Sequence, residues 1–264
     1  MNIFEKVSEC IKKGDVVVFT GSGISQESGI PTFRGEDGLW QKYDPQIFAS
    51  MPQVFFTFIS SPRQVIDFIS EIYQTFIVAE PNFAHLEIAR LQQQGFVKSI
   101  ITQNIDNLHQ EAGCLEIIEL HGNVYESVCI NCGWKRKHTK DEIKSFIEKV
   151  KPIKRRFEII KKSLDFIGRC PRCNMRLRPN VVFFGESLPS SEFKKAKYAI
   201  RNAQTLIIVG TSGEVAPASL LPYEAKKYGA CIIEINPSPS FREIDDFQIP
   251  LSAEEAFKNL SKYI

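Results

Sequence analysis

Short apolar runs alternate with longer amphipathic stretches along this chain, which is the pattern of a parallel sheet whose strands are joined by helices. Five runs indicate buried strands, at residues 15–19, 97–102, 116–120, 205–209 and 230–235. Helices are expected at about 3–13, 63–78 and 81–95, and again after Ser252, which has the spacing of a capping box with Glu255. The fold class that we predict is α/β, with a Rossmann-like, doubly wound parallel sheet.

The polar residues that follow these strands form the candidate site, because ligands bind outside the carboxyl ends of the strands in open α/β sheets. After the first strand, Gly21 and Gly23 allow the backbone to turn sharply and to approach a bound group closely. Ser25 is the expected start of a helix whose unpaired N–H groups would face a phosphate. Gln26 stands where the dinucleotide fingerprint has its third glycine, so the loop alone equally indicates a tight strand-to-helix turn.

Two other strands end in groups that suit catalysis and ligand binding. Gln103, Asn104 and Asp106 follow the second strand, and His121 follows the third. The ordinary pKa of an imidazole is ~6.5, so a neutral His121 is available at pH 7 as a general base. The alternative is an ordinary structural histidine at a strand end. The other histidines are expected to be packed, or solvated in the last case: His85, His109 and His138.

Four of the seven cysteines form two Cys-x-x-Cys pairs, Cys129 with Cys132 and Cys170 with Cys173. Each pair can place two thiolates on one ion, and two pairs complete a closed tetrahedral zinc site. The alternatives are a redox pair or free cysteines, but two matched pairs favour structural zinc. Because thiolates would fill all four positions, we expect this metal to take no part in catalysis.

The segment between the two cysteine pairs, residues 133–169, is unusually long and basic. It holds 13 Lys and Arg against 5 Asp and Glu, a formal charge of +8 in a chain whose net charge is +2. One helix is expected from Thr139 and a second after Pro152, with an inner face made of Phe157, Ile160, Leu164 and Ile167. The insertion is either a solvated helical hairpin or a docking surface for an acidic partner or nucleic acid.

These features divide the chain into a sheet domain, residues 1–122 and 180–264, and an inserted zinc-binding module, residues 123–179. Residues 36–80 are expected to be the helical part of the smaller domain, in which 36–60 is irregular but packed and carries a cofactor loop. The chain is 43% hydrophobic, has no apolar run of membrane-spanning length and shows no signal-peptide pattern. We therefore expect a cytoplasmic protein with no membrane contact.

Taken together, these motifs resemble the sirtuin family of NAD-dependent protein-lysine deacylases. The resemblance covers nearly the whole chain and rests on a set of blocks in the family's order: Gly21-Ser-Gly-Ile-Ser25, Gly29-Ile-Pro-Thr-Phe-Arg34, Pro81-Asn-Phe-Ala-His85, Thr102-Gln-Asn-Ile-Asp106, His121-Gly122, the two cysteine pairs, Val182-Phe-Phe-Gly-Glu186, Gly210-Thr-Ser212 and Asn236-Pro237. Ser22 and Thr32 depart from the alanine and aspartate that are common in the family. The long basic insertion is the main difference.

The resemblance implies that NAD lies across the strand ends, with its pyrophosphate over residues 21–25. Arg34 and Thr211 would then hold phosphates, Asn236 would hold the adenine-side ribose, and Asp106 would accept from the nicotinamide carboxamide. The full set of cofactor residues that the resemblance implies is Gly21, Ser22, Gly23, Ile24, Ser25, Thr32, Phe33, Arg34, Gln103, Asn104, Ile105, Asp106, Gly210, Thr211, Ser212, Asn236, Pro237, Ser238 and Ala253. The resemblance also implies one structural zinc ion per chain.

The implied reaction begins when the acyl oxygen of a modified lysine displaces nicotinamide from NAD. His121 would take a proton from a ribose hydroxyl, with Asn104 as the second catalytic residue, and Phe33 would shield the sugar from returning nicotinamide. The products would be free lysine, nicotinamide and O-acyl-ADP-ribose. The acyl-lysine protein or peptide would bind as an added strand, and the expected substrate residues are Val182, Phe184, Gly185, Glu186 and Val215.

An acyl preference also follows. Sirtuins that favour acidic acyl groups carry a Tyr and an Arg a turn apart in the helix before the Pro81 block. Residues 67–76 contain no Arg here, and their acids would repel a carboxylate, so we expect acetyl or longer apolar groups over succinyl.

Three other functions remain open on the sequence. Mono-ADP-ribosyl transfer to protein uses the same cleavage of NAD. Hydride transfer is disfavoured because Gln26 breaks the dinucleotide fingerprint. A zinc-ribbon module that binds DNA or RNA through the basic insertion would leave His121 and the strand-end clusters unexplained.

Overall fold

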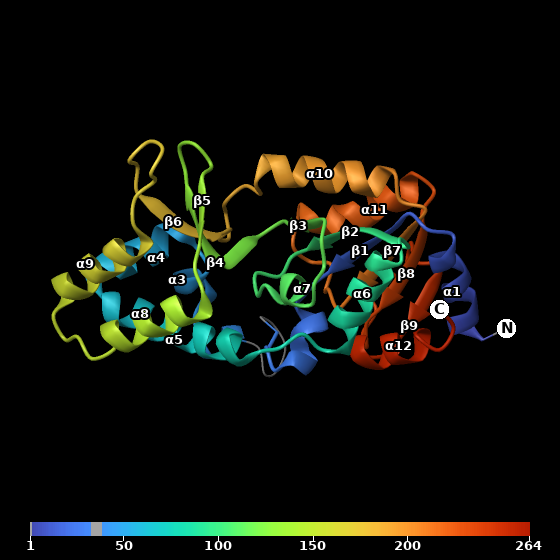
Figure 1. Cartoon of the computed structure of the whole chain (residues 1–264), viewed down its shortest axis with the longest axis horizontal. Coiled ribbons are helices and arrows are strands. Elements are labelled where there is room, and N and C mark those ends of the chain that lie inside the picture. Colours follow the sequence, from blue (N-terminus) through green and yellow to red (C-terminus); the bar gives the residue numbers. More distant parts are fainter. Residues whose placement is uncertain (1, 33–38) are drawn as a thin grey trace. The chain divides into compact units, whose positions relative to one another are not determined.

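The computed structural model describes residues 2–32 and 39–264 (Figure 1). The chain divides into two compact units: residues 1–32, 80–121 and 188–264 make the first, and residues 33–79 and 122–187 make the second. The second unit therefore consists of two insertions into the first. Phe33 and Arg34, which are expected at the cofactor, lie outside the described residues.

The first unit is built on a six-stranded sheet in the order β3-β2-β1-β7-β8-β9. The strands are β1 Val16–Thr20, β2 Val97–Thr102, β3 Ile117–Glu119, β7 Thr205–Val209, β8 Cys231–Ile235 and β9 Phe247–Ile249. Every pair of neighbours runs parallel, so the prediction of a Rossmann-like parallel sheet is confirmed. The edge strand β9 is not predicted, because its three residues are too few to show a period.

Both faces of this sheet are covered by helices (Figure 1). One face packs against α1 Ile3–Lys12, α6 Phe83–Gln93 and α12 Ala253–Leu260, and the other against α10 Ser190–Arg201 and α11 Leu221–Lys227. In β1, Val16 and Val18 join the first core and Val17 and Phe19 join the second. Burial on both faces explains why the strands appear in the sequence as continuous apolar runs rather than alternating ones.

The strand order reverses between β1 and β7, since the chain builds β2 and β3 on one side of β1 and then β7, β8 and β9 on the other. Such a reversal opens a crevice at the carboxyl ends of the two central strands. Short helical turns follow three of the strands: η1 Ser22–Ser28 after β1, α7 Leu108–Glu111 after β2 and η2 Ala218–Leu220 after β7. The expected helix start at Ser25 is wrong, because η1 is a 3₁₀ helix that begins at Ser22 and buries Ser25.

The second unit combines a three-stranded antiparallel sheet, in the order β5-β4-β6, with helices. Its elements are α2 Leu39–Lys42, α3 Pro45–Phe48, α4 Met51–Ser60, α5 Pro62–Val78, β4 Gly122–Cys129, β5 Lys135–Lys137, α8 Lys140–Val150, α9 Arg156–Ile167 and β6 Leu177–Val181. Ile66 of α5, Val150 of α8 and Ile159 of α9 form a buried cluster, so the basic insertion packs on α5. Among the helices that the structure describes in either unit, none is long and apolar enough to cross a membrane.

One expectation for this unit is wrong, and a second, the helix after Pro152, is confirmed as a helix but with other residues on its buried face. The stretch 36–60, expected to be irregular, contains three helices in its described part, and α4 alone is 10 residues long. In α9 the buried positions are Ile159 and Ser163, whereas Phe157 is 79% exposed. Both sets of positions in α9 fit a helical period, and the packing against α5, which the sequence does not reveal, selects between them.

Candidate functional site

The loops after β1 and β7 approach each other so closely that three glycines are needed. The N–H of Gly23 donates to the carbonyl oxygen of Gly210 at 2.8 Å. A Cβ on Gly23 would lie 2.7 Å from the Gly210 Cα, and a Cβ on Gly21 would lie 2.7 Å from the Gly210 carbonyl oxygen. These neighbours are main-chain atoms, which cannot swing aside. Residues 21–25 and 210–212, which we call the glycine cradle, therefore owe their shape to the absence of side chains at three positions.

Asn104 ties the segment after β2 to this cradle. Its Nδ2 donates to the carbonyl oxygen of Gly21 at 3.1 Å and to the hydroxyl of Ser25 at 3.2 Å. Its backbone N–H donates to the hydroxyl of Thr102 at 3.0 Å. Since both hydrogens of the side-chain amide are engaged, its oxygen is the atom that Asn104 can offer to a ligand.

Asp106 is buried and organises the same loop from within the protein. Its Oδ2 accepts from the hydroxyl of Ser25 at 2.7 Å, and its Oδ1 accepts from the backbone N–H of Leu108 at 3.0 Å. Burial raises the pKa of Asp106, and the hydrogen bonds from Leu108 and Ser25 oppose that rise. The carboxylate of Asp106 thus holds the Ser25 hydroxyl in position. A ligand could donate only to the lone pairs of this carboxylate that Ser25 and Leu108 leave unused.

His121 follows β3 and is held in one tautomer. Its Nδ1 lies 2.9 Å from the carbonyl oxygen of Gln103, which can only accept. The proton of the neutral ring is therefore on Nδ1, and Nε2 is the basic nitrogen. Burial lowers the pKa of His121 below its ordinary value of 6.5, and the hydrogen bond to Gln103 offsets part of that change. The ring is consequently neutral at pH 7, which is the form that a general base requires.

Hydrogen bonds also join the ends of β2, β7 and β8. The Nε2 of Gln103 donates to the hydroxyl of Thr211 at 2.9 Å, and the Nδ2 of Asn236 donates to the carbonyl oxygen of Thr211 at 3.0 Å. The N–H of Ser238 donates to the Oδ1 of Asn236 at 3.3 Å. The strand-end clusters predicted from the sequence are therefore parts of one connected edge of the first unit.

The remaining cofactor candidates differ in exposure. Half-buried residues are Ser22, Thr32 and Ile105, and exposed ones are Ser212, Pro237 and Ser238. Ile24 and Ala253 are buried in the core cluster that α1, α6 and α12 cover. The side chains of these two residues therefore serve packing.

Two threonines whose roles the motifs do not reveal support this edge. The hydroxyl of Thr20 donates to that of Thr102 at 2.9 Å and lies 3.0 Å from the Nε2 of His109. The available signal is a threonine at the last position of two neighbouring strands, directly after apolar residues. His109 and His85 are both buried, with their ring centres 4.9 Å apart, as expected for packed histidines. Burial lowers the pKa of His109 to about 4.

The four predicted zinc ligands come together in the second unit. The Sγ atoms of Cys129, Cys132, Cys170 and Cys173 all lie within 4.8 Å of one another, and three pairs are 3.4, 3.5 and 3.8 Å apart. A tetrahedron with Zn–S bonds of about 2.3 Å has edges of about 3.8 Å. Main-chain bonds from Gly133 to Cys129 and from Asn174 to Cys170 close the two turns. The four thiols are positioned to hold one zinc ion, with no place left for water.

Residues 182–186, after β6, are held by an ion pair that the sequence motifs do not reveal. Arg178 donates to the two carboxylate oxygens of Glu186 at 2.6 and 2.9 Å and to the carbonyl oxygen of Val181 at 2.8 Å. Glu186 also accepts from the N–H of Phe183 at 3.0 Å, and the N–H of Phe184 donates to the carbonyl oxygen of Ala49 at 2.6 Å. The carboxylate of Glu186 therefore shapes this segment. A basic residue eight positions before an acid is too common a pattern to reveal such a pair.

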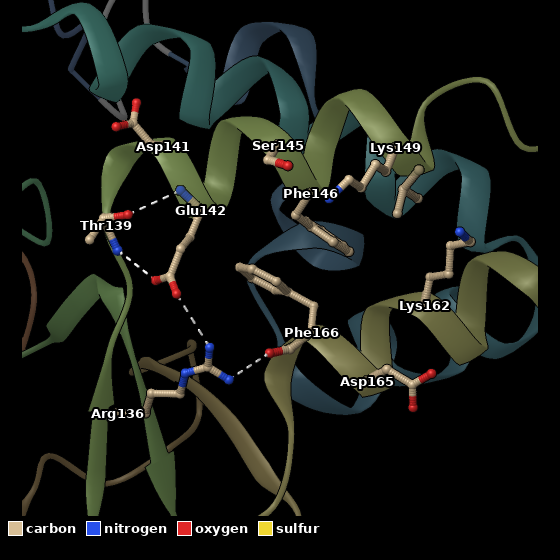
Figure 2. Close-up of a pocket in the computed structure, with 11 residues that line it drawn as sticks. Arg136, Thr139, Asp141, Glu142, Ser145, Phe146, Lys149, Lys162, Asp165 and Phe166 are labelled. Atoms are coloured by element: carbon tan, nitrogen blue, oxygen red, sulfur yellow. Dashed lines mark hydrogen bonds and ion pairs between the residues drawn. The ribbon is translucent and has the colours of Figure 1, made fainter.

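The helices of the basic insertion enclose a hollow of about 550 Å³ (Figure 2). The rings of Phe146 and Phe166 stack in it with centroids 4.2 Å apart. Arg136 pairs with Glu142 at 3.5 Å and donates to the carbonyl oxygen of Phe166 at 3.3 Å, as the dashed lines in Figure 2 show. The charged residues of the lining are Arg136, Lys149, Lys162, Asp141, Glu142 and Asp165. These charges balance, so the hollow itself does not select an anion.

His138, which was expected to be solvated, is buried, and that expectation is wrong. Its Nε2 lies 2.7 Å from the hydroxyl of Ser127, and its ring stacks on Phe166 with centroids 4.8 Å apart. The charged residues around it in the sequence conceal that β5 and α9 enclose this one position.

We expect Gly23→Ala to lower the free energy of unfolding by about 1–3 kcal/mol, because the added methyl would meet the backbone of Gly210. The neighbouring Ser22→Ala, at a half-buried position that already has a Cβ, should change it by less than about 0.5 kcal/mol. Urea unfolding of the two variants and the parent measures both values. Equal stability of Gly23→Ala and the parent would show that the two loops can separate at no cost.

Comparison with known proteins places this geometry in a family. The sequence pattern of the Sir2 family matches residues 21–217. The chain is 41% identical to the NAD-dependent protein deacylase of Aeropyrum pernix over 93% of its length and 91% of that protein, and 40% identical to that of Pyrococcus furiosus over 98% and 97%. A structure titled as a Sir2–p53 peptide–NAD⁺ complex matches with a TM-score of 0.77 and 31% identity, covering 99% of this chain and 98% of that one.

A structure of a Sir2 protein with a deacetylated p53 peptide and 3′-O-acetyl-ADP-ribose matches with a TM-score of 0.79, at 31% identity, over 99% of this chain and 98% of that one. The residues matched by the family pattern, 21–217, include the glycine cradle, His121 and both cysteine pairs. The resemblance noted in the sequence is thus confirmed across nearly all of the chain: it belongs to the Sir2 family, the sirtuins.

Proposed function

We propose that this protein is an NAD-dependent protein-lysine deacylase that transfers the acyl group to ADP-ribose. The observation that carries the proposal is the neutral imidazole of His121, fixed by Gln103 with Nε2 free to accept a proton. It belongs to the same strand-end edge as the glycine cradle. Relatives named NAD-dependent protein deacylase support the assignment.

NAD is a substrate in this reaction, and the first unit offers the groups to bind it. We place the pyrophosphate over the glycine cradle, where backbone atoms are exposed by the lack of side chains. The side-chain oxygen of Asn104 would accept from a ribose hydroxyl, and Thr211 and Asn236 would contact the adenine half. Arg34 and Phe33 remain predictions from the family resemblance.

In the proposed mechanism His121 accepts the proton of a ribose hydroxyl at Nε2. Nδ1 keeps its proton and donates it to the carbonyl oxygen of Gln103 throughout, so the ring keeps its orientation while it changes charge. The hydroxyl oxygen then attacks the imidate carbon, which still carries the lysine nitrogen. The bond from that carbon to nitrogen breaks next, and water completes the release of free lysine and O-acyl-ADP-ribose. Asn104 would hold the sugar during these steps.

We propose that the acyl-lysine peptide adds as a strand to residues 182–186. The backbone N–H groups of Phe183, Phe184 and Glu186 are already engaged within the second unit, so the peptide would have to pair with other backbone groups of this segment. The 45% exposed side chain of Phe184 offers an apolar wall for the lysine stem. Pairing with the segment around Val215 remains a prediction.

The acidic residues of α5 repel a succinyl group less than their number in the sequence suggests. Glu71 of α5 is paired with Lys42 at 2.6 Å and accepts from the hydroxyl of Tyr43, so its charge is largely compensated. Asp67 is only loosely paired, with Arg63 at 4.0 Å. The expected preference for apolar acyl groups therefore rests on the absence of an arginine from residues 67–76 more than on repulsion.

The proposed function is tested by incubating matched acetyl-lysine and succinyl-lysine peptides with the protein, with and without NAD. We expect NAD-dependent loss of the acetyl group, formation of O-acetyl-ADP-ribose, and a lower kcat/KM for the succinyl peptide. Mass analysis of peptide and nucleotide products distinguishes the outcomes. ADP-ribosylated protein in place of O-acetyl-ADP-ribose would favour mono-ADP-ribosyl transfer, and no cleavage of NAD would refute both enzymatic functions.

We expect His121→Ala to bind NAD normally but to lose most deacylation. In the parent, kcat/KM should rise with pH through the pKa of the base and level off above it. Because burial lowers that pKa, the midpoint should lie below 6.5. Calorimetric NAD binding and pH-dependent peptide kinetics provide the measurements. Near-normal turnover by the variant would remove His121 from the mechanism.

We also propose, as a second function, that the loop between α8 and α9 binds a polyanion. Lys151, Lys154, Arg155 and Arg156 are all exposed there, next to the exposed ring of Phe157.

The four thiols of the zinc site suit a reducing compartment, which supports the cytoplasmic location that we propose.

Replacing Lys154, Arg155 and Arg156 together with alanine should weaken binding to single-stranded DNA or to a polyaspartate peptide and reduce its salt dependence. The control replaces three lysines of α10, Lys194, Lys195 and Lys197, which removes the same charge elsewhere. Fluorescence anisotropy at several salt concentrations compares the variants. Salt-independent binding, or no binding by the parent, would leave the insertion as a solvated hairpin.

A further inference from the structure

A buried carboxylate lies among the apolar residues of the sheet, and the proposed mechanism does not use it. Glu234 of β8 is 0% exposed. Its neighbours in the strand, Ile233 and Ile235, face one core of the first unit, and Ile232 faces the other. By strand alternation Glu234 is on the side of Ile232, where an apolar residue is the rule. A carboxylate in such a place is costly unless hydrogen bonds compensate it.

The partners of Glu234 are two consecutive backbone N–H groups. Its Oε1 accepts from Ser240 at 2.6 Å and its Oε2 accepts from Phe241 at 2.9 Å. Both oxygens are therefore committed to one point of the loop that leaves β8. Without the carboxylate, the N–H of the buried Phe241 would lack the acceptor that its burial requires.

Phe241 connects this point to the loop after β7. Its side chain is 1% exposed, and a Cβ added to Gly213 would lie 2.9 Å from the Cζ of its ring. The ring thus packs against Gly213, the residue that follows the glycine cradle. Ser240 and Phe241 cannot shift without disturbing that loop.

The start of the same β8 loop is also held in place. Asn236, two residues after Glu234, donates to the carbonyl oxygen of Thr211 and accepts from the N–H of Ser238. The segment 236–241 is thus held to the loop 210–213 at both of its ends. Glu234 closes the ring of contacts from within the sheet.

We propose that Glu234 is a positioning residue for NAD, which it does not touch: it sets the shape of the two loops that carry Thr211, Ser212 and Asn236. This inference rests on the proposed function, because those residues are its expected contacts with the adenine half. It implies that the effect of losing Glu234 falls on the binding of NAD and leaves the acyl-peptide and the chemical step unchanged.

The test compares Glu234→Gln with the parent. Glutamine keeps the volume and one acceptor but turns an NH₂ group toward one of the two N–H donors. We expect the KM for NAD to rise by about tenfold, which corresponds to the loss of one charge-assisted hydrogen bond. The kcat and the KM for the acetyl-lysine peptide should stay within about twofold, and NAD should raise the Tm of the variant less than that of the parent.

Glu224→Gln is the matched control. This change removes a carboxylate of the same unit that pairs with Lys197 and Arg201 at the surface. It should leave the KM for NAD unchanged. Phe241→Leu keeps the carboxylate but weakens the contact with Gly213, so it should also raise the KM for NAD. If Glu234→Gln does not fold, the KM for NAD of Phe241→Leu tests the inference instead.

An unchanged KM for NAD in both Glu234→Gln and Phe241→Leu would overturn the inference. So would a fall in kcat with equal changes in both KM values, which is the behaviour of a residue that only stabilises the fold. A parent protein that neither binds nor cleaves NAD would instead refute the proposed function, and the two failures are therefore distinguishable.

Discussion

The contact between two backbones, at Gly23 and Gly210, is the constraint on which the rest of the structure depends. It brings together the loops of β1 and β7, the two central strands on either side of the reversal in strand order. With no room for a Cβ at this contact, the loops form one surface of main-chain atoms. Asn104 donates hydrogen bonds to Gly21 and Ser25 of these loops, and Gln103 donates one to Thr211. The polar groups at the ends of the strands therefore hold one another in position.

The two units divide the proposed work. Every described group that we assign to NAD, and the proposed base, belongs to the parallel-sheet unit, where strand geometry fixes positions closely. The segment assigned to the peptide belongs to the second unit, which has small cores, a cluster of four thiols and the Arg178–Glu186 ion pair in place of a deep sheet core. The groups proposed to bind NAD are thus held in place by the packed core of the sheet. The segment proposed to bind the peptide is held by an ion pair and lies in the unit that contains the four thiols.

The sequence predicts what local chemistry determines. Apolar runs predict the central strands, because burial on both faces leaves Thr20 as the one polar residue of β1, and the spacing of the cysteines predicts the zinc site. The inner face of α9, the burial of His138 and the helices within 39–60 depend on which surface packs against which, and no periodic pattern carries that information. For the same reason the motifs point to Glu186 and Asn236 but not to Arg178 and Glu234, whose roles come from contacts across a turn.

The carbonyl oxygen of Gln103, which accepts from Nδ1 of His121, affects how readily the protonated ring gives up its second proton. In many hydrolases the second imidazole nitrogen faces an aspartate, whose full negative charge stabilises the imidazolium. Here it faces a peptide carbonyl, which carries only a partial charge. In the role that we propose, the protonated ring is therefore a comparatively strong acid that releases its proton readily. Such a residue is suited to passing a proton on to the departing amine, and it returns to its resting state without help from another ionised side chain.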